Sequence, residues 1–415
     1  EGQQMNLNAI LKGEDYKDIN LDFNDVDLAK IAPSTNNLTF AGTIDGSIQV
    51  KQLQPDQYKP TADIHIEKFI LNDQHIGDLK FNVVGDDKFR KFNVDTRIVD
   101  QGAEKLYLTG DIDFESDKKG KLDLEVGLDK FKMVPLEKVL GTIFKNIRGF
   151  ASGKALVEGN LTDPEINGRV YLNDAGMQIP FLGIDFDMEQ NASIDVTENQ
   201  FLLRHIKVTD TKHNTLAYID GSVRHKRMQD WFLDVDVTSK NMLILDTKDD
   251  LEKPFYGTAF IDGKANISGP TNSLVIDIEA KSNPGTTIKL PLGDTAGGLG
   301  DNSFIHFLSL KEKEALKKGL EVNDKSISGI EMNFNLDITP DAEIEIILDR
   351  NSGHGMKGRG VGSINMEINT LGKFRMVGDY QVWDGEYNFK YGGLIDKKFE
   401  VKKFSTIRWA EIGRA

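Results

Sequence analysis

The stretch GIEMNFNLDI, residues 329–338, alternates between apolar and polar side chains along its whole length. Its apolar members are Ile330, Met332, Phe334, Leu336 and Ile338, and its polar members are Glu331, Asn333, Asn335 and Asp337. Successive side chains of a β-strand point to opposite faces, so this pattern predicts a strand with one apolar face and one polar face. Something must cover the apolar face, and what covers it bears directly on function.

The same alternation recurs along the chain. It is found at residues 105–114, 121–128, 183–189, 232–237, 275–280, 342–349 and 363–368. Asp-Gly pairs, which are typical of tight hairpins, occur at 45–46, 220–221, 262–263 and 384–385. At ordinary strand and loop lengths the chain is expected to be all-β, with about 30 short strands.

Helical patterns are few. Residues 135–147 place apolar side chains on one helical face after Pro135, which is typical of a first helical turn. A second helix is expected over residues 303–320, with Ser303 as its cap, and a weaker helical turn just before Pro33. Three short helices cannot cover the apolar faces of so many strands. The strands therefore either cover one another or enclose something else.

An internal repeat is visible in the spacing of the glycines. Residues 153–172 and 263–280 both begin with Gly-Lys-Ala and continue with an apolar strand, a glycine, a polar turn and a second strand. Residues 362–381 follow the same plan more loosely. Repetition of one supersecondary unit predicts an array in which each unit contacts mainly its neighbours, so that the chain grows longer instead of rounder.

The breaks in this array are gradual. The expected segments are 1–150 with a helix near 135–147, 151–350 with a helical insertion near 303–320, and 351–415. Glycine-rich stretches at 291–302 and 351–360 interrupt the alternation and are interpreted as insertions, the second of them a hairpin loop.

Composition excludes several classes of protein. The 415 residues include no cysteine, which rules out disulfides and thiolate sites and suits the oxidising bacterial envelope. There are 51 basic and 66 acidic side chains, and the net charge of −15 disfavours binding to nucleic acid or to anionic lipid surfaces. No apolar run is long enough to span a bilayer, and the alternation is already under way at Met5. We therefore expect a fragment whose membrane anchor lies outside it.

The residues provide no positive argument for an enzyme, a metal or a cofactor. GHGMKG, residues 353–358, has the glycine spacing of a dinucleotide loop, but a strand pattern follows it where that site needs a helix. The seven histidines lack metal-ligand spacing. Carboxylate pairs such as Asp185 with Asp187 belong to the polar phase of alternating strands and are expected to face solvent.

Two architectures can cover the apolar faces. In a closed sandwich or solenoid, two walls pack against each other and fill the interior with side chains. In an open U-shaped sheet the inner face stays unfilled and holds an apolar guest along its length. The alternation slightly favours the closed form. The 23 phenylalanines, against 9 tyrosines and 3 tryptophans, mildly favour an inner surface that contacts only hydrocarbon.

The C-terminal stretch YQVWDGEYNFKYGGLIDKKFEVKKFSTIRW, residues 380–409, resembles the C-terminal region of the TamB family, the periplasmic subunits of the translocation and assembly module. The family's G-x-Y-x-F unit is matched by Gly385, Tyr387 and Phe389, and its final G-[ST]-[IL]-x-W unit lies over Ser405, Thr406, Ile407 and Trp409. The two Gly-Lys-Ala repeats also resemble the family's order of glycine, strand, glycine and polar turn.

The resemblance implies a β-taco, a long sheet curled around an apolar groove that shields the acyl chains of phospholipids while the head groups stay outside. It implies a periplasmic protein of a Gram-negative bacterium, anchored in the inner membrane by a segment absent from this chain and reaching a TamA-like barrel of the BamA family. About 30 strands at a spacing of about 4.8 Å would make a trough on the order of 140 Å long.

Two other roles stay open. In the first, the protein assists assembly of outer-membrane β-barrels, with open strand edges that add to barrel strands and a C-terminal region that docks on the barrel partner. Candidates for that docking are Tyr387, Phe389, Ile407 and Trp409. In the second, the chain is a closed β-solenoid stalk with a dry, filled interior.

The groove lining is expected to be the apolar phase of the strands. The residues assigned to it are Leu122, Leu124, Val126, Ile184, Phe186, Met188, Met332, Phe334, Leu336, Ile338, Ile344, Ile346, Ile364, Met366, Ile368, Phe374 and Met376. Ordinary core packing is the competing explanation for each of them, so the hypothesis concerns the row and not the single residue. A charge in mid-row, such as Phe334→Glu, is expected to block lipid passage without unfolding the protein.

Overall fold

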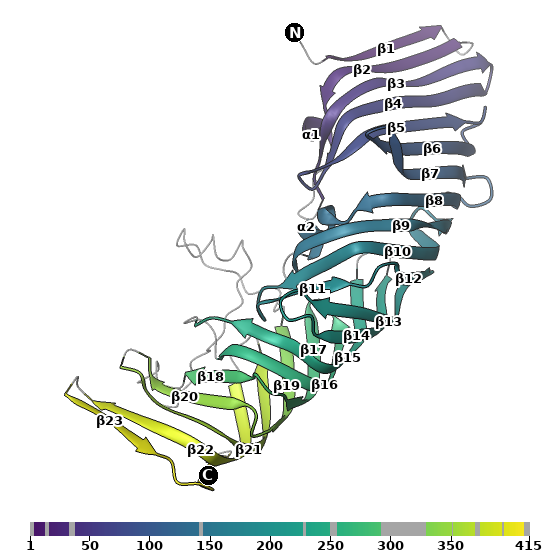
Figure 1. Cartoon of the computed structure of the whole chain (residues 1–415). Coiled ribbons are helices and arrows are strands. Elements are labelled where there is room, and N and C mark those ends of the chain that lie inside the picture. Colours follow the sequence, from purple (N-terminus) through teal and green to yellow (C-terminus); the bar gives the residue numbers. More distant parts are fainter. Residues whose placement is uncertain are drawn as a thin grey trace, which may run out of the picture. The chain divides into compact units, whose positions relative to one another are not determined.

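The alternating stretches form β-strands in the computed structural model of the protein (Figure 1). The structure describes the chain apart from residues 1–3, 13–15, 33–37, 141–143, 227–229, 250–254, 292–328, 351, 370–373, 392–393 and 411–415. Within the described part there are 24 strands, some of them 15 to 18 residues long. The all-β prediction is confirmed, and the strands are longer than the short ones expected.

The chain divides into two compact units. Unit 1 comprises Glu1–Met177, Met188–Arg204 and Arg224–Gln229, and unit 2 comprises Gln178–Asp187, His205–Val223 and Asp230–Ala415. The strands within unit 1 are β1 (Gln4–Lys12), β2 (Tyr16–Asp27), β3 (Phe40–Gln54), β4 (Gln57–Leu71), β5 (Gln74–Gly85), β6 (Lys91–Asp100), β7 (Ala103–Asp113), β8 (Lys121–Lys132), β9 (Lys145–Asn160) and β12 (Ala192–Thr197).

The strands within unit 2 are β15 (Asp230–Thr247), β16 (Tyr256–Pro270), β17 (Ser273–Ser282), β18 (Thr287–Pro291), β19 (Gly329–Ile338), β20 (Glu343–Asp349), β21 (His354–Asn369), β22 (Phe374–Tyr391), β23 (Ile395–Glu400) and β24 (Thr406–Trp409). Four strands have residues in both units: β10 (Asp163–Ile179), β11 (Ile184–Met188), β13 (Gln200–Asp210) and β14 (Leu216–Lys226).

In unit 1 each strand from β1 to β8 pairs antiparallel with the next one in the sequence. β10 pairs with β12, also antiparallel. Short polar turns between alternating strands favour this hairpin order. Apolar side chains from β2 to β6 form a core of Val26, Ile44, Ile64, Ile66, Phe69, Ile76 and Ile98.

In unit 2 the long strands β16 and β21 each pair with two shorter strands, one along each half of their length. β16 pairs with β17 over residues 261–268 and with β18 over residues 256–258. β21 likewise pairs with β19 along one half and with β20 along the other. The pairs β17–β19 and β18–β20 are parallel, which requires a long connection, and residues 292–328 separate β18 from β19. β22 pairs with β21, β23 and β24.

The helix predicted over residues 135–147 is confirmed over 135–140 and wrong at its C-terminal end, and residues 141–143 lie outside the described part. The chain forms a 3-10 turn, Val134–Leu136, followed by the short helix α2, Glu137–Leu140. β9 begins at Lys145, so residues 145–147 are strand and not helix, and β9 pairs with β8 from Phe150 to Asn160.

The weaker helical turn before Pro33 is confirmed as α1, Leu28–Ile31. The Asp27 carboxylate caps it by accepting a hydrogen bond from the Ala29 N–H at 3.0 Å. The helix predicted over residues 303–320 lies outside the described residues. The helices that the structure describes are all too short to cross a membrane.

Several strands carry a residue in the left-handed region that is held in the same way each time. In β2 the register against β3 shifts between Phe23 and Val26, and Asp25 in this bulge has φ of 53°. The Asp25 N–H donates to Asp45 Oδ1 on β3 at 3.1 Å. Four more left-handed residues donate equivalent hydrogen bonds of 2.6 to 2.9 Å. The pairs are Lys68 to Asp78, Lys130 to Ser152, His205 to Asp220 and Asn241 to Asp262. We call Asp45, Asp78, Ser152, Asp220 and Asp262 the bulge acceptors.

The prediction of hairpins at the Asp-Gly pairs is wrong. The pairs at 45–46, 220–221 and 262–263 lie inside β3, β14 and β16, and their aspartates are bulge acceptors. The following glycine allows the next strand to approach closely, since a Cβ on Gly263 would lie 2.2 Å from the Glu279 carbonyl oxygen. The fourth pair, at 384–385, lies inside β22 beside a register shift.

The hairpin loop predicted at residues 351–360 is also mostly strand. β21 begins at His354, and the glycines that follow pair with β20 and β22. A Cβ on Gly360 would lie 2.0 Å from the Gln381 carbonyl oxygen. The glycines here allow close packing of strands, which explains why a glycine-rich stretch forms no loop.

Candidate functional site

The predicted lining residues of β19 and β21 lie on the same face of the sheet. The register pairs Met332 with Ile368, Phe334 with Met366 and Leu336 with Ile364, and directly paired residues share a face. Neighbouring strands continue it, through Ala265 and Ile267 of β16, Ile276, Ile278 and Ala280 of β17, and Met376 of β22. We call this surface the unit 2 apolar face.

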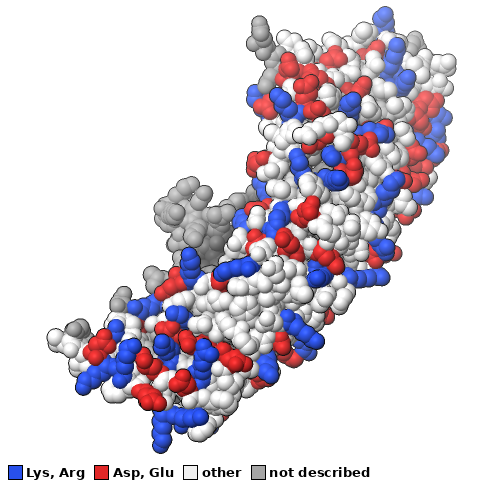
Figure 2. All heavy atoms as spheres, viewed as in Figure 1, with Lys and Arg blue, Asp and Glu red and all other residues white. Residues whose placement is uncertain are grey.

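The opposite face of the same strands is polar. Its cross-strand contacts are Asn333 to Asp277 at 2.9 Å, Asn266 to Asp236 at 2.9 Å, Lys264 to Glu279 at 3.0 Å and Arg375 to Glu367 at 3.2 Å. Exposed pairs of this kind add little stability, but they keep the face in water. Acidic and basic side chains are likewise interspersed over the surface seen in Figure 2. The alternation therefore separates a polar, solvent-exposed face from an apolar face.

Aromatic side chains help to bury the unit 2 apolar face. Met332 and Ile368 form a cluster in which Ile368 is only 1% exposed. The side chains packed against this cluster are Phe181, Phe255, Ile276, Ile330 and Phe334. Phe181 lies in the turn before β11, and Phe255 directly precedes β16. Both aromatic side chains come from unit 2 itself, from positions outside its regular strands.

A second apolar cluster includes side chains of β18, β20 and β22. It consists of Leu290, Ile344, Tyr380 and Val382, with Phe255, Ile288, Ile338, Val401, Ile407 and Trp409 packed against it. The Tyr380 hydroxyl donates to the Gly358 carbonyl at 3.1 Å, and burial raises the pKa of Tyr380 to about 12. Two of the predicted docking residues, Ile407 and Trp409, are thus half-buried in unit 2.

The other two predicted docking residues belong to an aromatic group. His354 Nε2 lies 2.7 Å from the Tyr387 hydroxyl, and the rings of His354, Tyr387, Phe389 and Phe399 are 5.3 to 6.5 Å apart in contacting pairs. Phe399, on β23, remains half exposed. This group gives the C-terminal strands an aromatic surface.

Unit 1 has the same division into two faces. Leu124 of β8, a predicted lining residue, belongs to a row that register pairs extend through Gly110, Val94, Val83, Ala62, Ile48 and Leu21 to Leu7 of β1. A parallel row runs from Val126 through Leu108, Thr96, Phe81, Ile64, Gly46 and Phe23 to Met5. Apolar side chains of eight consecutive strands, β1 to β8, therefore share one face.

The side chains on this face become more exposed toward β1. Leu124 is buried, whereas Phe81 is 36% exposed, Ile48 41% and Leu7 67%. Met5 and Ile19 on the same face are also exposed. We call Met5, Leu7, Ile19, Ile48 and Phe81 the unit 1 apolar strip. None of them is among the residues predicted to line the groove, although the alternation at the start of the chain was a signal that could have found them.

The remaining predicted lining residues follow the expected alternation. Those that are buried are Leu122, Ile184, Phe186, Ile344, Ile346 and Ile364, and those that are half-buried are Val126, Met188, Leu336, Ile338, Met366 and Met376. Phe374 pairs with Ile368, and its side chain lies outside the described part. The residues fall into separate groups on β8, β11 and the strands of unit 2.

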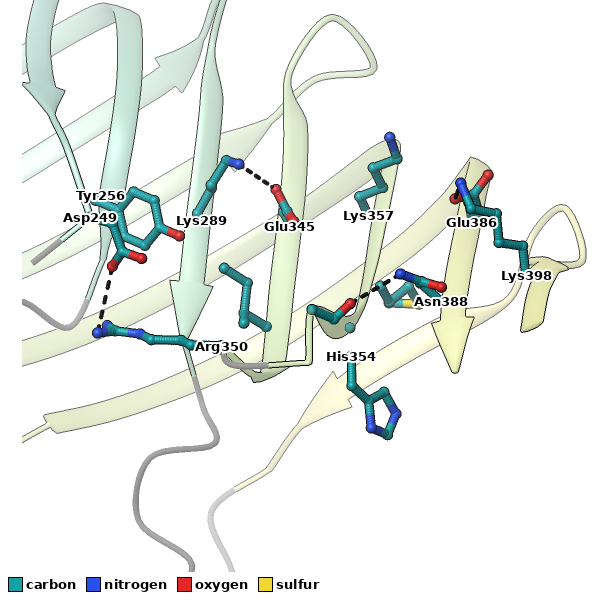
Figure 3. Close-up of a pocket in the computed structure, with 14 residues that line it drawn as sticks. Asp249, Tyr256, Lys289, Glu345, Arg350, His354, Lys357, Glu386, Asn388 and Lys398 are labelled. Atoms are coloured by element: carbon teal, nitrogen blue, oxygen red, sulfur yellow. Dashed lines mark hydrogen bonds and ion pairs between the residues drawn. The ribbon is translucent and has the colours of Figure 1, made fainter. Parts of the chain in front are cut away.

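A polar pocket of about 340 Å³ lies over β18, β20, β21 and β22 (Figure 3). Charged side chains of opposite sign are paired within it: Lys289 with Glu345 at 2.8 Å, Arg350 with Asp249 at 3.5 Å and Lys398 with Glu386 at 3.0 Å. Lys289, Glu345, Lys357 and Glu386 occupy one row of the register, on the polar side of the strands. Opposite charges in this pocket therefore largely neutralise one another.

No group of three or more metal-ligating side chains occurs among the residues that the structure describes. A family model for the TamB C-terminal domain matches residues 204–412, half of the 415-residue chain. No curated protein and no solved structure matches the chain.

Proposed function

This chain belongs to the TamB family, and from that premise we propose that it carries the acyl chains of phospholipids along apolar sheet faces between the inner and outer membranes. TamB proteins are non-enzymatic proteins of the Gram-negative cell envelope. An inner-membrane anchor preceding this segment, and a TamA-like barrel of the BamA family at the outer membrane, are parts of the same proposal.

The observation that supports this proposal most directly is the unit 1 apolar strip. Large apolar side chains gathered on one face of adjacent strands are typical of a surface that meets an apolar partner. Removing one CH₂ group from water contributes about 0.8 kcal/mol. An acyl chain with ten CH₂ groups, each half-buried against the protein, therefore gains on the order of 4 kcal/mol of binding free energy. A row of such low-affinity contacts suits a lipid that must bind and then pass to the next site.

We further propose that unit 2 curls around its apolar side chains as a β-taco. β17 is followed by β18, and β19 by β20, after short turns at 283–286 and 339–342. These turns lie side by side, since Thr339 N–H donates to Ser282 Oγ at 2.9 Å and Glu343 N–H to the Thr286 carbonyl at 2.9 Å. Two strands that turn together make a curved sheet whose two apolar clusters would lie inside it.

The test compares two glutamates on the same strand. Phe81 belongs to the unit 1 apolar strip, whereas Val84, also on β5 and 50% exposed, has the opposite parity and faces the polar side. Phospholipid bound to the purified chain is counted by native mass spectrometry. Phe81→Glu should weaken lipid binding at the strip by at least about tenfold, because a buried charge costs more than about 1.4 kcal/mol.

Val84→Glu is the matched control and should leave bound lipid unchanged. Thermal unfolding of both variants shows whether the fold survives, and Phe81→Leu should retain lipid. Equal loss of lipid in both glutamate variants, or lipid binding that survives Phe81→Glu, would contradict lipid carriage by this face.

A second candidate function is assembly of outer-membrane β-barrels with the same barrel partner. The observation that favours it is β23, all six residues of which are exposed and which pairs with β22 within the described residues. An exposed strand edge can add a strand from another chain. A peptide copy of a barrel strand should then bind, and Phe399→Glu should abolish that binding without changing the amount of bound lipid.

A further inference from the structure

Phe255 lies between the two apolar clusters of unit 2. It packs against the Met332–Ile368 cluster and also against the cluster of Leu290, Ile344, Tyr380 and Val382. Its direction follows from the register of β16 with β18. Tyr256 pairs with Lys289 in the polar row and Gly257 pairs with Ile288 in the apolar row. Phe255 alternates with Tyr256 and therefore lies on the apolar side of the strand.

The two clusters lie at different places along the unit 2 strands, and the second includes side chains on both sides of the turn at 339–342, such as Ile338 and Ile344. Met332 lies on β19, before the turn at 339–342, and Ile344 lies on β20, after it. Thr339 lies seven positions after Met332, which is about 23 Å of extended chain. Phe255 therefore joins the Met332–Ile368 cluster, well before the turn, to the cluster that surrounds the turn.

Exposure on the apolar face differs between the unit 1 apolar strip and the Met332–Ile368 cluster of unit 2. Leu7 and Phe81 of unit 1 are exposed on their face, while Ile368 of unit 2 is almost completely buried on its own. Phe181 and Phe255 contribute to that burial, together with apolar side chains of the strands. Phe181 and Phe255 thus add cover to the unit 2 apolar face from positions outside its strand ladder.

We propose that Phe255 is a gating side chain that occupies the place of an acyl chain between the two apolar clusters of unit 2. The inference rests on the proposed function and names the residue that decides whether a lipid can lie on the Met332–Ile368 cluster. Phe255 precedes the first residue of β16, so its ring can turn aside without breaking the ladder with β17 or β18. An unbranched acyl chain is slender enough to take the place of the ring.

The experiment uses a phospholipid with a diazirine near the end of one acyl chain. The whole chain is incubated with vesicles that contain it and is irradiated, and labelled peptides are identified by mass spectrometry. The quantity compared is the labelling of β17–β21 relative to that of β1–β5. Phe255→Ala should raise this ratio several-fold, and Phe255→Trp should lower it.

Phe232→Ala is the matched control. Phe232 lies on β15 one residue before Leu233, and Val235 pairs with Ile267 of the unit 2 apolar face, so Phe232 has the opposite parity. Its loss should leave the labelling ratio unchanged. The Trp variant keeps an aromatic ring in the cluster, so it tests the proposal even if the Ala variant does not fold.

The outcomes separate this inference from the proposed function. If β1–β5 is labelled in every variant but the ratio does not respond to Phe255→Ala or Phe255→Trp, the gating role is overturned and lipid carriage stands. If β17–β21 of the unaltered chain is labelled as strongly as β1–β5, the gating role is also overturned. If neither region is labelled in any variant, the proposed function itself fails.

Discussion

At the scale of single residues, the position of a side chain in the alternation decides which environment it meets. Asn333 and Phe334 are neighbours on β19, yet the first donates a hydrogen bond to Asp277 in the polar row and the second packs against the Met332–Ile368 cluster. A substitution is therefore expected to act according to its face and its local cover, and much less according to its place in the sequence.

Phe334→Glu is expected to destabilise unit 2 by about 3 kcal/mol or more, since it places a carboxylate in a cluster that is already packed. The expectation from the sequence was a block of lipid passage without unfolding. Urea denaturation followed by circular dichroism measures the change. Asn335→Lys, at an exposed position beside Glu279 in the register, should shift stability by less than about 0.5 kcal/mol. Equal stability of both variants would show that the cluster does not support the fold.

Asp210 is expected to contribute to acid sensitivity. It is fully buried at the end of β13, before the turn to β14, and burial alone would raise its pKa. Hydrogen bonds from the Thr215 hydroxyl and from the N–H groups of Thr215, His213 and Lys212 outweigh burial and lower the pKa of Asp210 below its ordinary value.

A lowered pKa in the folded state means that the stabilisation is complete above the unfolded pKa of about 3.9 and is lost as the pH falls through the lower folded value. Asp210→Asn should therefore be less stable than the unaltered chain by a constant amount from pH 7 to pH 5. The difference should shrink below about pH 4. Urea midpoints measured from pH 7 to pH 2.5 test this, and a difference independent of pH would refute it.

At the scale of elements, bulges recur with a side-chain acceptor on the neighbouring strand. The sequence Ile-Asp-Gly occurs at 44–46, 219–221 and 261–263, each time with a bulge acceptor in the middle. Both Gly-Lys-Ala repeats follow a bulge acceptor, Ser152 or Asp262. The glycines detected as a repeat in the sequence thus coincide with places where a strand is held against the left-handed residue of its neighbour.

Asp262→Ala is expected to destabilise unit 2 by about 1 to 3 kcal/mol, because the Asn241 N–H and the Asn283 amide lose their acceptor. Asp262→Asn keeps one oxygen acceptor and should recover part of the loss. Lys264→Ala, two residues on and in an exposed ion pair, is the control and should change stability by less than about 1 kcal/mol. Urea unfolding measures all three, and an Ala variant as stable as the control would contradict a role for this contact.

At the scale of the whole molecule, the two units differ in how much of their apolar face is exposed. A ligand that binds the folded state stabilises the region it contacts. A phospholipid with short acyl chains, added below its micelle concentration, should therefore slow amide hydrogen exchange in β1–β5 more than in β17–β21. Hydrogen-exchange mass spectrometry with and without the lipid measures the difference. Equal protection of both regions would mean that the exposed strip is not where lipid first binds.

The sequence by itself determined that the chain is all-β and which side chains share a face, because a period of two follows from backbone geometry alone. It also pointed to the TamB family through the C-terminal stretch. It misjudged the Asp-Gly pairs and the glycine-rich stretch at 351–360, since the role of a glycine or an aspartate depends on which strand lies beside it.

Only the tertiary structure decided which apolar face is covered. Met5 and Met332 have the same place in their alternating patterns, yet one is exposed and the other is packed beneath Phe181 and Phe255. Those aromatic residues are far from Met332 in the sequence and belong to a turn and to the approach to a strand. The direction of a side chain is a local property of the backbone, whereas its cover comes from distant segments that only folding brings together.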